Sequence, residues 1–450
     1  MAALYELQEP MKGGRPGLPP LDSNSNNDSF TLHGRTYALP KRPTVVICID
    51  GFDPTYLSQG ITSGILPTLN GFVRDGFHAT ADVAMPSFTN PNNVSIVTGA
   101  SPAIHGIAGN YFLDRDTGKE TMIVDDSLLR GSTILAEAAR RGVRVAAVTA
   151  KDKLRRILAH DLTVRNGVED DDNNSGGGGS SSICFSAECA SDDTLRWLGR
   201  ETRPDQYSAD LSLFVLDAGV KILREDRADL LYLTLSDFVQ HKHAPGSPAA
   251  DAFMAAVDGR VGALAGLGAV VAVTGDHGMS DKSDAGGAPN VLFLQDELEG
   301  RFGRGCARVI CPITDPFVKH HGALGSFVRV YVAAGAERAD PALVGEMVAY
   351  SQTLPQVEVA LLGEEAAERY EMPLDREGDF VVVAKADAVI GSRAEEHDLG
   401  SLGGHRLRSH GGLSEQKVPL LLSTAVRDDV AIRSRRWRNF DAFDLALNHQ

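Results

Sequence analysis

One short segment offers a hydroxyl nucleophile beside residues that begin a helix. It runs from Pro86 to Asn93, contains Thr89 among two prolines and three asparagines, and precedes the apolar residues Val94, Ile96 and Val97. Asparagine caps the free amide groups at the start of a helix, and that end of a helix favours an anion. The segment therefore places Thr89 where a phosphoryl group could bind. Taken alone, an ordinary helix cap beside a proline turn explains the segment better, so its interpretation depends on residues elsewhere.

Acidic residues follow two apolar runs. Val45 to Ile49 leads into Asp50, and Leu230 to Leu235 leads into Ser236 and Asp237. His241 comes one helical turn after Asp237, so a helix beginning there would carry both side chains on one face, a separation suited to binding one ion. On spacing alone, such a pair is more often a surface ion pair. The pattern gains weight because it repeats.

The strongest repeat carries both ligand types together. Ala269 to Val273 leads into Asp276 and His277, with glycine on both flanks, and His410 lies in a glycine-containing loop further along. Carboxylate oxygen and imidazole nitrogen are ligands that zinc accepts in open catalytic sites. Three carboxylates at strand ends and three histidines are hard to explain as coincidental capping.

Three further polar residues suit an anion. Asn110 follows a glycine-rich stretch and could donate an amide hydrogen bond to an oxyanion. Lys151 and Lys153 follow an apolar run from Val143 to Val148. Lysines in that position are usually solvated, but here they would lie where the sheet edge opens on a pocket. We therefore carry an anion-binding role for the pair as a hypothesis.

The elements that must position these residues indicate an α/β fold. Short runs that are apolar throughout are typical of strands buried on both faces in a parallel sheet, and open α/β sheets bind ligands at the carboxyl ends of their strands. We predict a mainly parallel central sheet flanked by helices, formed by residues 31–281 and 406–450. Residues 282–405 contain strand-like runs of their own at Phe327–Val332, Val357–Leu362 and Phe380–Ala384 and are predicted to form a smaller inserted cap domain. Residues 1–30 are predicted to be a flexible leader, and the glycine- and serine-rich stretch 173–182 a surface loop.

Composition limits the partners. The chain has 450 residues, 43% hydrophobic content and a formal net charge of -16, so its surface should repel nucleic acid and anionic lipid. No apolar stretch is long enough to predict a membrane span. Five cysteines, an odd number, favour reduced thiols and a cytoplasmic location. The oligomeric state is left open, with a homodimer as one option.

These motifs together resemble a known family. The chain is similar to the alkaline phosphatase superfamily, in its nucleotide pyrophosphatase/phosphodiesterase-like branch, and within that branch to the phosphonoacetate hydrolases. The matching segments are Asp50-Gly51, Ser87 to Asn93, Gly106 to Tyr111, Ser236-Asp237, His241 to Gly246, Asp276 to Met279 and Ser409 to Gly412. The resemblance extends from about Leu32 to the last strands.

The resemblance implies a site with two zinc ions. It assigns Asp237, His241 and His410 to one ion, and Asp50, Asp276, His277 and the oxygen of Thr89 to the other. It also implies that Thr89 is the nucleophile and that Asn110, Lys151 and Lys153 bind the substrate. The expected reaction is hydrolysis of the carbon-phosphorus bond of phosphonoacetate, a small anion, to acetate and phosphate through a phosphothreonine intermediate.

Two alternatives stay open. A phosphodiesterase or nucleotide pyrophosphatase of the same superfamily would use the same ligands with a pocket that stacks a base. An inactive metal-binding relative would keep the ligands without the reaction.

Overall fold

The computed structural model describes residues 28–165, 182–315, 322–332, 339–402, 404–426 and 434–449. Most of the predicted leader, nearly all of the glycine- and serine-rich loop, and the histidine pair at 320 and 321 lie outside these ranges. The leader boundary needs a correction. Residues 29 and 30 belong to β1 (Ser29–Leu32), which pairs antiparallel with β2 (Arg35–Ala38), and the Phe30 side chain is buried in the core.

The centre of the molecule is an eight-stranded sheet. In their order across the sheet, its strands are β4 (Phe77–Asp82), β20 (Lys417–Leu422), β11 (Val270–Thr274), β3 (Thr44–Cys48), β10 (Leu230–Thr234), β7 (Val145–Thr149), β9 (Ser182–Ser186) and β8 (Val164–Arg165). From β11 to β8 every neighbouring pair is parallel. Of the eight strands described, only β20 is reversed: it runs antiparallel to both of its neighbours, β11 and β4. The predicted mainly parallel sheet is confirmed.

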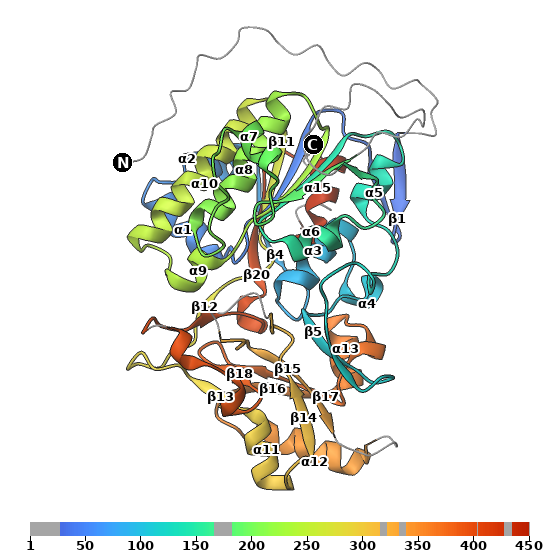
Figure 1. The fold of residues 1–450 in the computed structure, drawn as a ribbon, viewed down its shortest axis with the longest axis vertical. Helices are drawn as coiled ribbons and strands as arrows, with labels where there is room; N and C mark the ends of the chain where they lie inside the picture. The colour runs from blue at the N-terminus through green and yellow to red at the C-terminus, as the bar shows by residue number, and fades with distance from the viewer. Residues whose placement is uncertain are drawn as a thin grey trace.

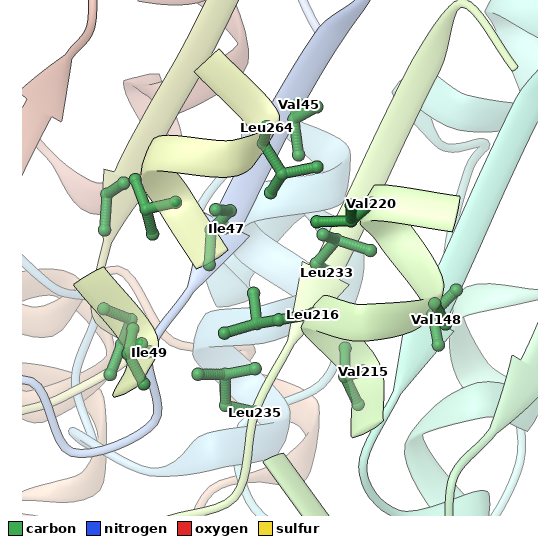
Figure 2. Packing of buried hydrophobic residues seen from close by; sticks show 14 of the residues in the cluster. Val45, Ile47, Ile49, Val148, Val215, Leu216, Val220, Leu233, Leu235 and Leu264 are labelled. Carbon is green, nitrogen blue, oxygen red and sulfur yellow. The ribbon is translucent and has the colours of Figure 1, made fainter. Parts of the chain in front are cut away.

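Helices cover both faces of this sheet (Figure 1). One face packs against α1 (Pro54–Thr62), α2 (Pro67–Asp75), α7 (Asp192–Leu198), α8 (Ala209–Arg224) and α10 (Pro248–Gly266). The other face packs against α3 (Thr89–Thr98), α5 (Ile134–Ala139), α6 (Asp152–Leu158) and α15 (Ala442–Asn448). Figure 2 shows the first of these clusters, with Ile47, Leu216 and Leu264 among its side chains. Burying a Leu or Ile side chain contributes about 1.5–3 kcal/mol, so these layers hold the strand ends firmly.

A second, smaller sheet lies in the lower part of Figure 1. It is wholly antiparallel, and its strands in order are β14 (Ala307–Ile310), β15 (Phe327–Val332), β17 (Phe380–Ala384) and β16 (Val357–Leu362). The helices α11 (Leu294–Phe302), α12 (Pro341–Gln352) and α13 (Gly363–Tyr370) belong to this part. Three of the four strands have the bounds that their apolar runs predict. The cluster of this part also includes Met85 and Phe88, which precede α3 in the core.

Two short strands stand on either side of the second sheet's segment. β12 (Ser280–Asp281) pairs antiparallel with β19 (Arg408–Ser409), so the chain leaves the core and returns to it at nearly the same place. This pairing supports our proposal that residues 282–405 are an inserted domain. Within the described residues, no helix combines the length and apolar character needed to cross a membrane.

Candidate active site

Polar residues gather at one edge of the central sheet. Asp50 follows β3, Lys151 follows β7, Asp237 follows β10 and Asp276 follows β11. These four strands are neighbours in the sheet and run parallel, so their carboxyl ends meet at one edge. The structure thus brings together residues that lie far apart in the sequence.

Thr89 is the first residue of α3, which begins at the same edge. Its Oγ1 lies 3.3 Å from Nε2 of His277. The turn before the helix is held by the amide of Asn92, whose oxygen accepts from the backbone of Ala84 and whose nitrogen donates to the carbonyl of Phe88. An amide committed to backbone groups in this way fixes the direction in which the helix, and therefore Thr89, enters the site.

Asp237, His241 and His410 form one group of potential metal ligands. Asp237 immediately precedes α9 (Phe238–Lys242), and its Oδ2 lies 2.8 Å from Nε2 of His241 on the same helical face. Nε2 of His410 lies 3.8 Å from the same oxygen. Asp237 and His241 are therefore close together, as their spacing in the sequence predicts, and the side chains of Asp237, His241 and His410 are all buried.

Asp50, Asp237 and His277 form a second group. Nε2 of His277 lies 3.1 Å from Oδ1 of Asp50 and 3.8 Å from Oδ1 of Asp276. Asp276 itself belongs to neither group, and its Oδ1 accepts from the backbone amides of Gly51 and His277, at 3.1 Å each. A carboxylate has lone pairs to spare beyond these bonds, so Asp276 can also face a cation.

All three histidines present the same ring nitrogen to the site. Nδ1 of His241 lies 2.7 Å from the carbonyl of Arg408, that of His277 lies 2.9 Å from the carbonyl of Gly278, and that of His410 lies 2.9 Å from the carbonyl of Ser87. A carbonyl can only accept, so each Nδ1 carries a proton, and each ring in its neutral form has its lone pair on Nε2. Metal-binding histidines are commonly oriented in this way.

The electrostatics of the group call for a cation. The Asp50 side chain is fully buried, and apart from the contact of its Oδ1 with Nε2 of His277, its carboxylate accepts no hydrogen bond from a described residue. Burial lowers the pKa of His277, but the carboxylates of Asp276 and Asp50 outweigh this effect and raise its pKa to about 10. Burial, followed by the charge of Asp50, raises the pKa of Asp276 well above its usual value. Buried carboxylate oxygens and imidazole nitrogens are the donor types that divalent zinc binds.

A small cavity joins this cluster to the expected substrate-binding residues. Its walls include Thr89, Asn110, Lys151 and Lys153, together with residues of both ligand groups. Oδ1 of Asn110 is buried without a donor among the described residues, while its nitrogen donates to the carbonyl of Ile313 at 3.2 Å. The structure therefore brings Thr89, Asn110, Lys151 and Lys153 together around one cavity. Among the described residues, no donor reaches the side-chain oxygen of Asn110.

The two lysines are held by carboxylates. Nζ of Lys151 lies 3.3 Å from Oδ1 of Asp237, and Nζ of Lys153 lies 2.6 Å from Oδ2 of Asp315. Burial lowers the pKa of Lys151, but Asp237 and Asp50 outweigh it and the net shift is upward. For Lys153, burial dominates and lowers the pKa despite Asp315. Of the two, Lys151 is the more firmly charged.

The sequence did not indicate Asp315 or Ile313, which line the same cavity. Both come from the segment that we propose as the inserted domain, so a wall of the site belongs to the second part of the molecule. An Asp before a proline ordinarily reads as a turn. No spacing in the sequence relates Asp315 to Lys153, because their contact exists only when the two parts are packed together.

Comparisons with known proteins identify the family and the fold. A family model described as type I phosphodiesterase / nucleotide pyrophosphatase matches residues 44–412. The crystal structure of phosphonoacetate hydrolase from Sinorhizobium meliloti 1021 in complex with phosphonoformate is similar with a TM-score of 0.84 and 44% identity, covering 93% of this chain and 98% of that one. Murine ectonucleotide pyrophosphatase / phosphodiesterase 5 shares the fold, with a TM-score of 0.59 at 18% identity over 91% of this chain and 97% of that one.

Curated relatives match over shorter segments. A phosphonoacetate hydrolase from Penicillium oxalicum is 59% identical over 46 residues, which are 10% of this chain and 64% of that protein. An uncharacterized pyrophosphatase/phosphodiesterase from Schizosaccharomyces pombe is 41% identical over 76 residues, which are 17% of this chain and 15% of that protein. The matches thus span less than two thirds of either curated relative.

Proposed function

The chain belongs to the type I phosphodiesterase / nucleotide pyrophosphatase family and is a hydrolase, and from that premise we propose that it cleaves the carbon-phosphorus bond of phosphonoacetate to give acetate and phosphate. One observation carries the choice of substrate: Lys151 and Lys153 line the same cavity as Thr89. Two ammonium groups beside a nucleophile suit a small anion with charge at both ends. The 44% identity to a phosphonoacetate hydrolase over 93% of the chain supports the same substrate.

The residues that would hold two zinc ions are those that the family resemblance implies; the first ligand group contains all three residues of one ion, and the second contains Asp50 and His277 of the other. We assign Asp237, His241 and His410 to one ion, and Asp50, Asp276, His277 and Thr89 to the other. When bound, the ions would supply positive charge that favours the ionised hydroxyl and stabilises charge on the attacking and leaving atoms. The inward-facing Nε2 atoms and the buried carboxylate of Asp50, whose Oδ2 has no hydrogen-bond donor among the described residues, support this assignment.

The chemistry of the chain's own residues then has two steps. Thr89 loses its hydroxyl proton to solvent, its Oγ1 forms a bond to phosphorus, and the carbon-phosphorus bond breaks with its electron pair on carbon. The acetate carbanion delocalises that pair onto its carboxylate and takes a proton from water. Water then attacks phosphorus, the bond from phosphorus to Oγ1 breaks, and Thr89 recovers its proton as phosphate leaves.

Lys151, Lys153 and Asn110 would bind and orient the substrate. An ammonium group beside the carboxylate of the leaving acetate stabilises the charge that grows there as the bond breaks. Asn110 would donate to a phosphoryl oxygen. Its side chain bridges toward the carbonyl of Ile313, so the proposed inserted domain helps to set the position of that amide.

Phosphate release from phosphonoacetate tests the proposal directly. We expect release by the wild-type protein loaded with zinc, and a loss of at least about a thousandfold in Thr89→Ala because the attacking oxygen is removed. Thr98→Ala at the other end of the same helix is the matched control, since its hydroxyl donates only to backbone carbonyls within α3. Equal activity in wild type and Thr89→Ala would rule out the threonine as nucleophile.

The family match makes a phosphodiesterase or nucleotide pyrophosphatase the second candidate. Such an enzyme stacks a base against an aromatic side chain. The described residues that line the cavity include no Phe, Tyr or Trp, and Tyr207 lines an adjoining cavity that shares Lys151 and Lys153. Hydrolysis of nitrophenyl phosphodiesters compared with phosphonoacetate separates the two activities. An inactive relative would release nothing from either substrate, and activity abolished by chelation and restored by zinc would exclude it.

A further inference from the structure

Asn93 lies between the nucleophile and a proposed metal ligand. It is fully buried on α3, one turn after Thr89. Its side-chain nitrogen donates to the backbone carbonyl of Thr89 at 3.0 Å and to Oδ2 of Asp276 at 3.1 Å. One amide group therefore contacts both the residue that would attack phosphorus and the carboxylate that would face a zinc ion.

The amide can take only one orientation. Its oxygen accepts from the hydroxyl groups of Tyr232 and Thr234 at 2.7 Å each. The carbonyl of Thr89 and the carboxylate of Asp276 are acceptors only, so turning the amide over would place an oxygen against two oxygens. All four hydrogen bonds available to the side chain are made, and Tyr232 and Thr234 are themselves fully buried.

The side chain of Asn93 makes more hydrogen bonds than are needed to stabilise α3 itself. A bond from Asn93 to Thr89 alone would be a local feature within α3. The partners Tyr232 and Thr234 come from β10, and Asp276 follows β11, so the amide ties the helix to two separate strand ends. Because β3 lies between these strands in the sheet, the network spans the edge from which Asp50 also projects.

We propose that Asn93 is a positioning residue that sets the distance between Thr89 and the zinc ion assigned to Asp50, Asp276 and His277. This inference rests on the proposed function. The amide holds the backbone of Thr89 and the carboxylate of Asp276 in one rigid unit, and the hydroxyls of Tyr232 and Thr234 prevent that unit from rotating. Residues that orient metal ligands from behind commonly affect metal affinity or activity by about 10–100-fold when they are changed.

The test uses Asn93→Leu, which keeps the approximate size and removes both donors, and Tyr232→Phe, which removes one of the hydroxyls that hold the amide. Zinc dissociation constants are measured by competition with a chromogenic chelator, alongside kcat and KM for phosphonoacetate. In Asn93→Leu we expect the affinity for one of the two zinc ions and kcat each to fall by about 10–100-fold, with a smaller change in KM. Tyr232→Phe should lower the same two quantities measurably but by a smaller factor, about two- to tenfold.

Thr98→Val is the control, because it removes a buried hydrogen bond from the same helix without touching the site. A purely structural role for Asn93 would lower the melting temperature of Asn93→Leu while the folded protein kept wild-type zinc affinity and kcat, and that result would overturn the proposal. If Asn93→Leu does not fold, unchanged zinc affinity and kcat in Tyr232→Phe would overturn it. A wild type that binds zinc but releases no phosphate from phosphonoacetate would refute the proposed function, whereas the zinc affinities would still decide the role of Asn93.

Discussion

Each histidine ring in the site is directed by a backbone carbonyl behind it. The carbonyls belong to Ser87, Gly278 and Arg408, and none of these residues is itself a ligand. The consequence is that side-chain substitutions at those three positions leave the acceptor in place, whereas a shift of the backbone turns the ring. At the scale of single residues, the site thus depends on main-chain geometry as much as on ligand identity.

The lysine pair gives a prediction about substrate binding. Lys151→Ala or Lys153→Ala should raise KM for phosphonoacetate by about 10–100-fold, because each removes a charged hydrogen-bond donor worth about 1.5–3 kcal/mol. Steady-state kinetics check this. Lys221→Ala serves as the control, since that lysine pairs with Glu225 on the surface of α8. Kinetics that match the wild type would remove either lysine from the site.

His105 gives a prediction about pH. Burial lowers its pKa from 6.5 to about 3. Both ring nitrogens have hydrogen-bond partners: Nδ1 accepts from the amide of Ile107, and Nε2 contacts Oγ of Ser95. The unfolded chain therefore binds a proton below pH 6.5 that the folded chain refuses until about pH 3. The stability contributed by the neutral ring is fully present above pH 6.5 and falls with pH through this window.

We expect the free energy of unfolding to fall less steeply between pH 7 and pH 5 in His105→Gln than in the wild type, by about 2 kcal/mol over the interval. Urea unfolding at the two pH values measures it. Parallel slopes for the two proteins would show that the imidazole is not kept neutral.

Much of the site could be predicted from individual elements. The apolar runs before Asp50, Asp237 and Asp276 identified buried parallel strands, and parallel strands must end together, so the convergence of their carboxylates followed from local pattern alone. The helix that begins at Asp237 likewise placed His241. Asp315 could not be predicted, because its contact with Lys153 depends on how two sheets pack, which no local pattern encodes.

Arg329 of β15 gives a prediction at the scale of elements. Its guanidinium donates to the carbonyl of Ala108 in the core and to Oε2 of Glu377, at 3.1 and 3.2 Å, and both charged groups are buried. Arg329→Met should lower the free energy of unfolding by about 3–5 kcal/mol, since it leaves the Glu377 carboxylate buried without its partner. Denaturant unfolding measures the loss. The double variant with Glu377→Gln should recover part of it, and no recovery would mean that the lost packing of Arg329 is responsible.

For the molecule as a whole, the proposed metal site is a concentration of carboxylates in a chain that already carries a net charge of -16. Its carboxylates lie at the centre of the sheet edge, under a wall to which Asp315 and Ile313 contribute. Without a cation, their mutual repulsion opposes the folded state. Binding of the proposed zinc ions should therefore stabilise the folded state. The cytoplasmic location, the lack of nucleic-acid partners and the oligomeric state stay predictions.

Metal removal tests that link. Chelation should abolish phosphate release and lower the melting temperature, because a ligand present at 1,000 times its dissociation constant stabilises the folded state by about 4 kcal/mol. Differential scanning calorimetry with and without chelator measures the shift, and zinc should reverse it where magnesium does not. If the melting temperature were the same with and without the chelator, the ions would make no contribution to stability.

Phe88 stands immediately before Thr89, yet its ring packs in the apolar cluster of the smaller sheet and contacts the ring of His410 edge-on. The neighbour of the proposed nucleophile is thus already part of the interior of the smaller part of the molecule. If the insert were replaced by that of a distant relative, Phe88 would no longer pack well against it. The poor packing would lie one residue from Thr89. A chimera should therefore exchange Met85 and Phe88 together with the insert. If the crossover points were placed only at the boundaries of residues 282–405, these two side chains would be separated from the apolar cluster in which they pack.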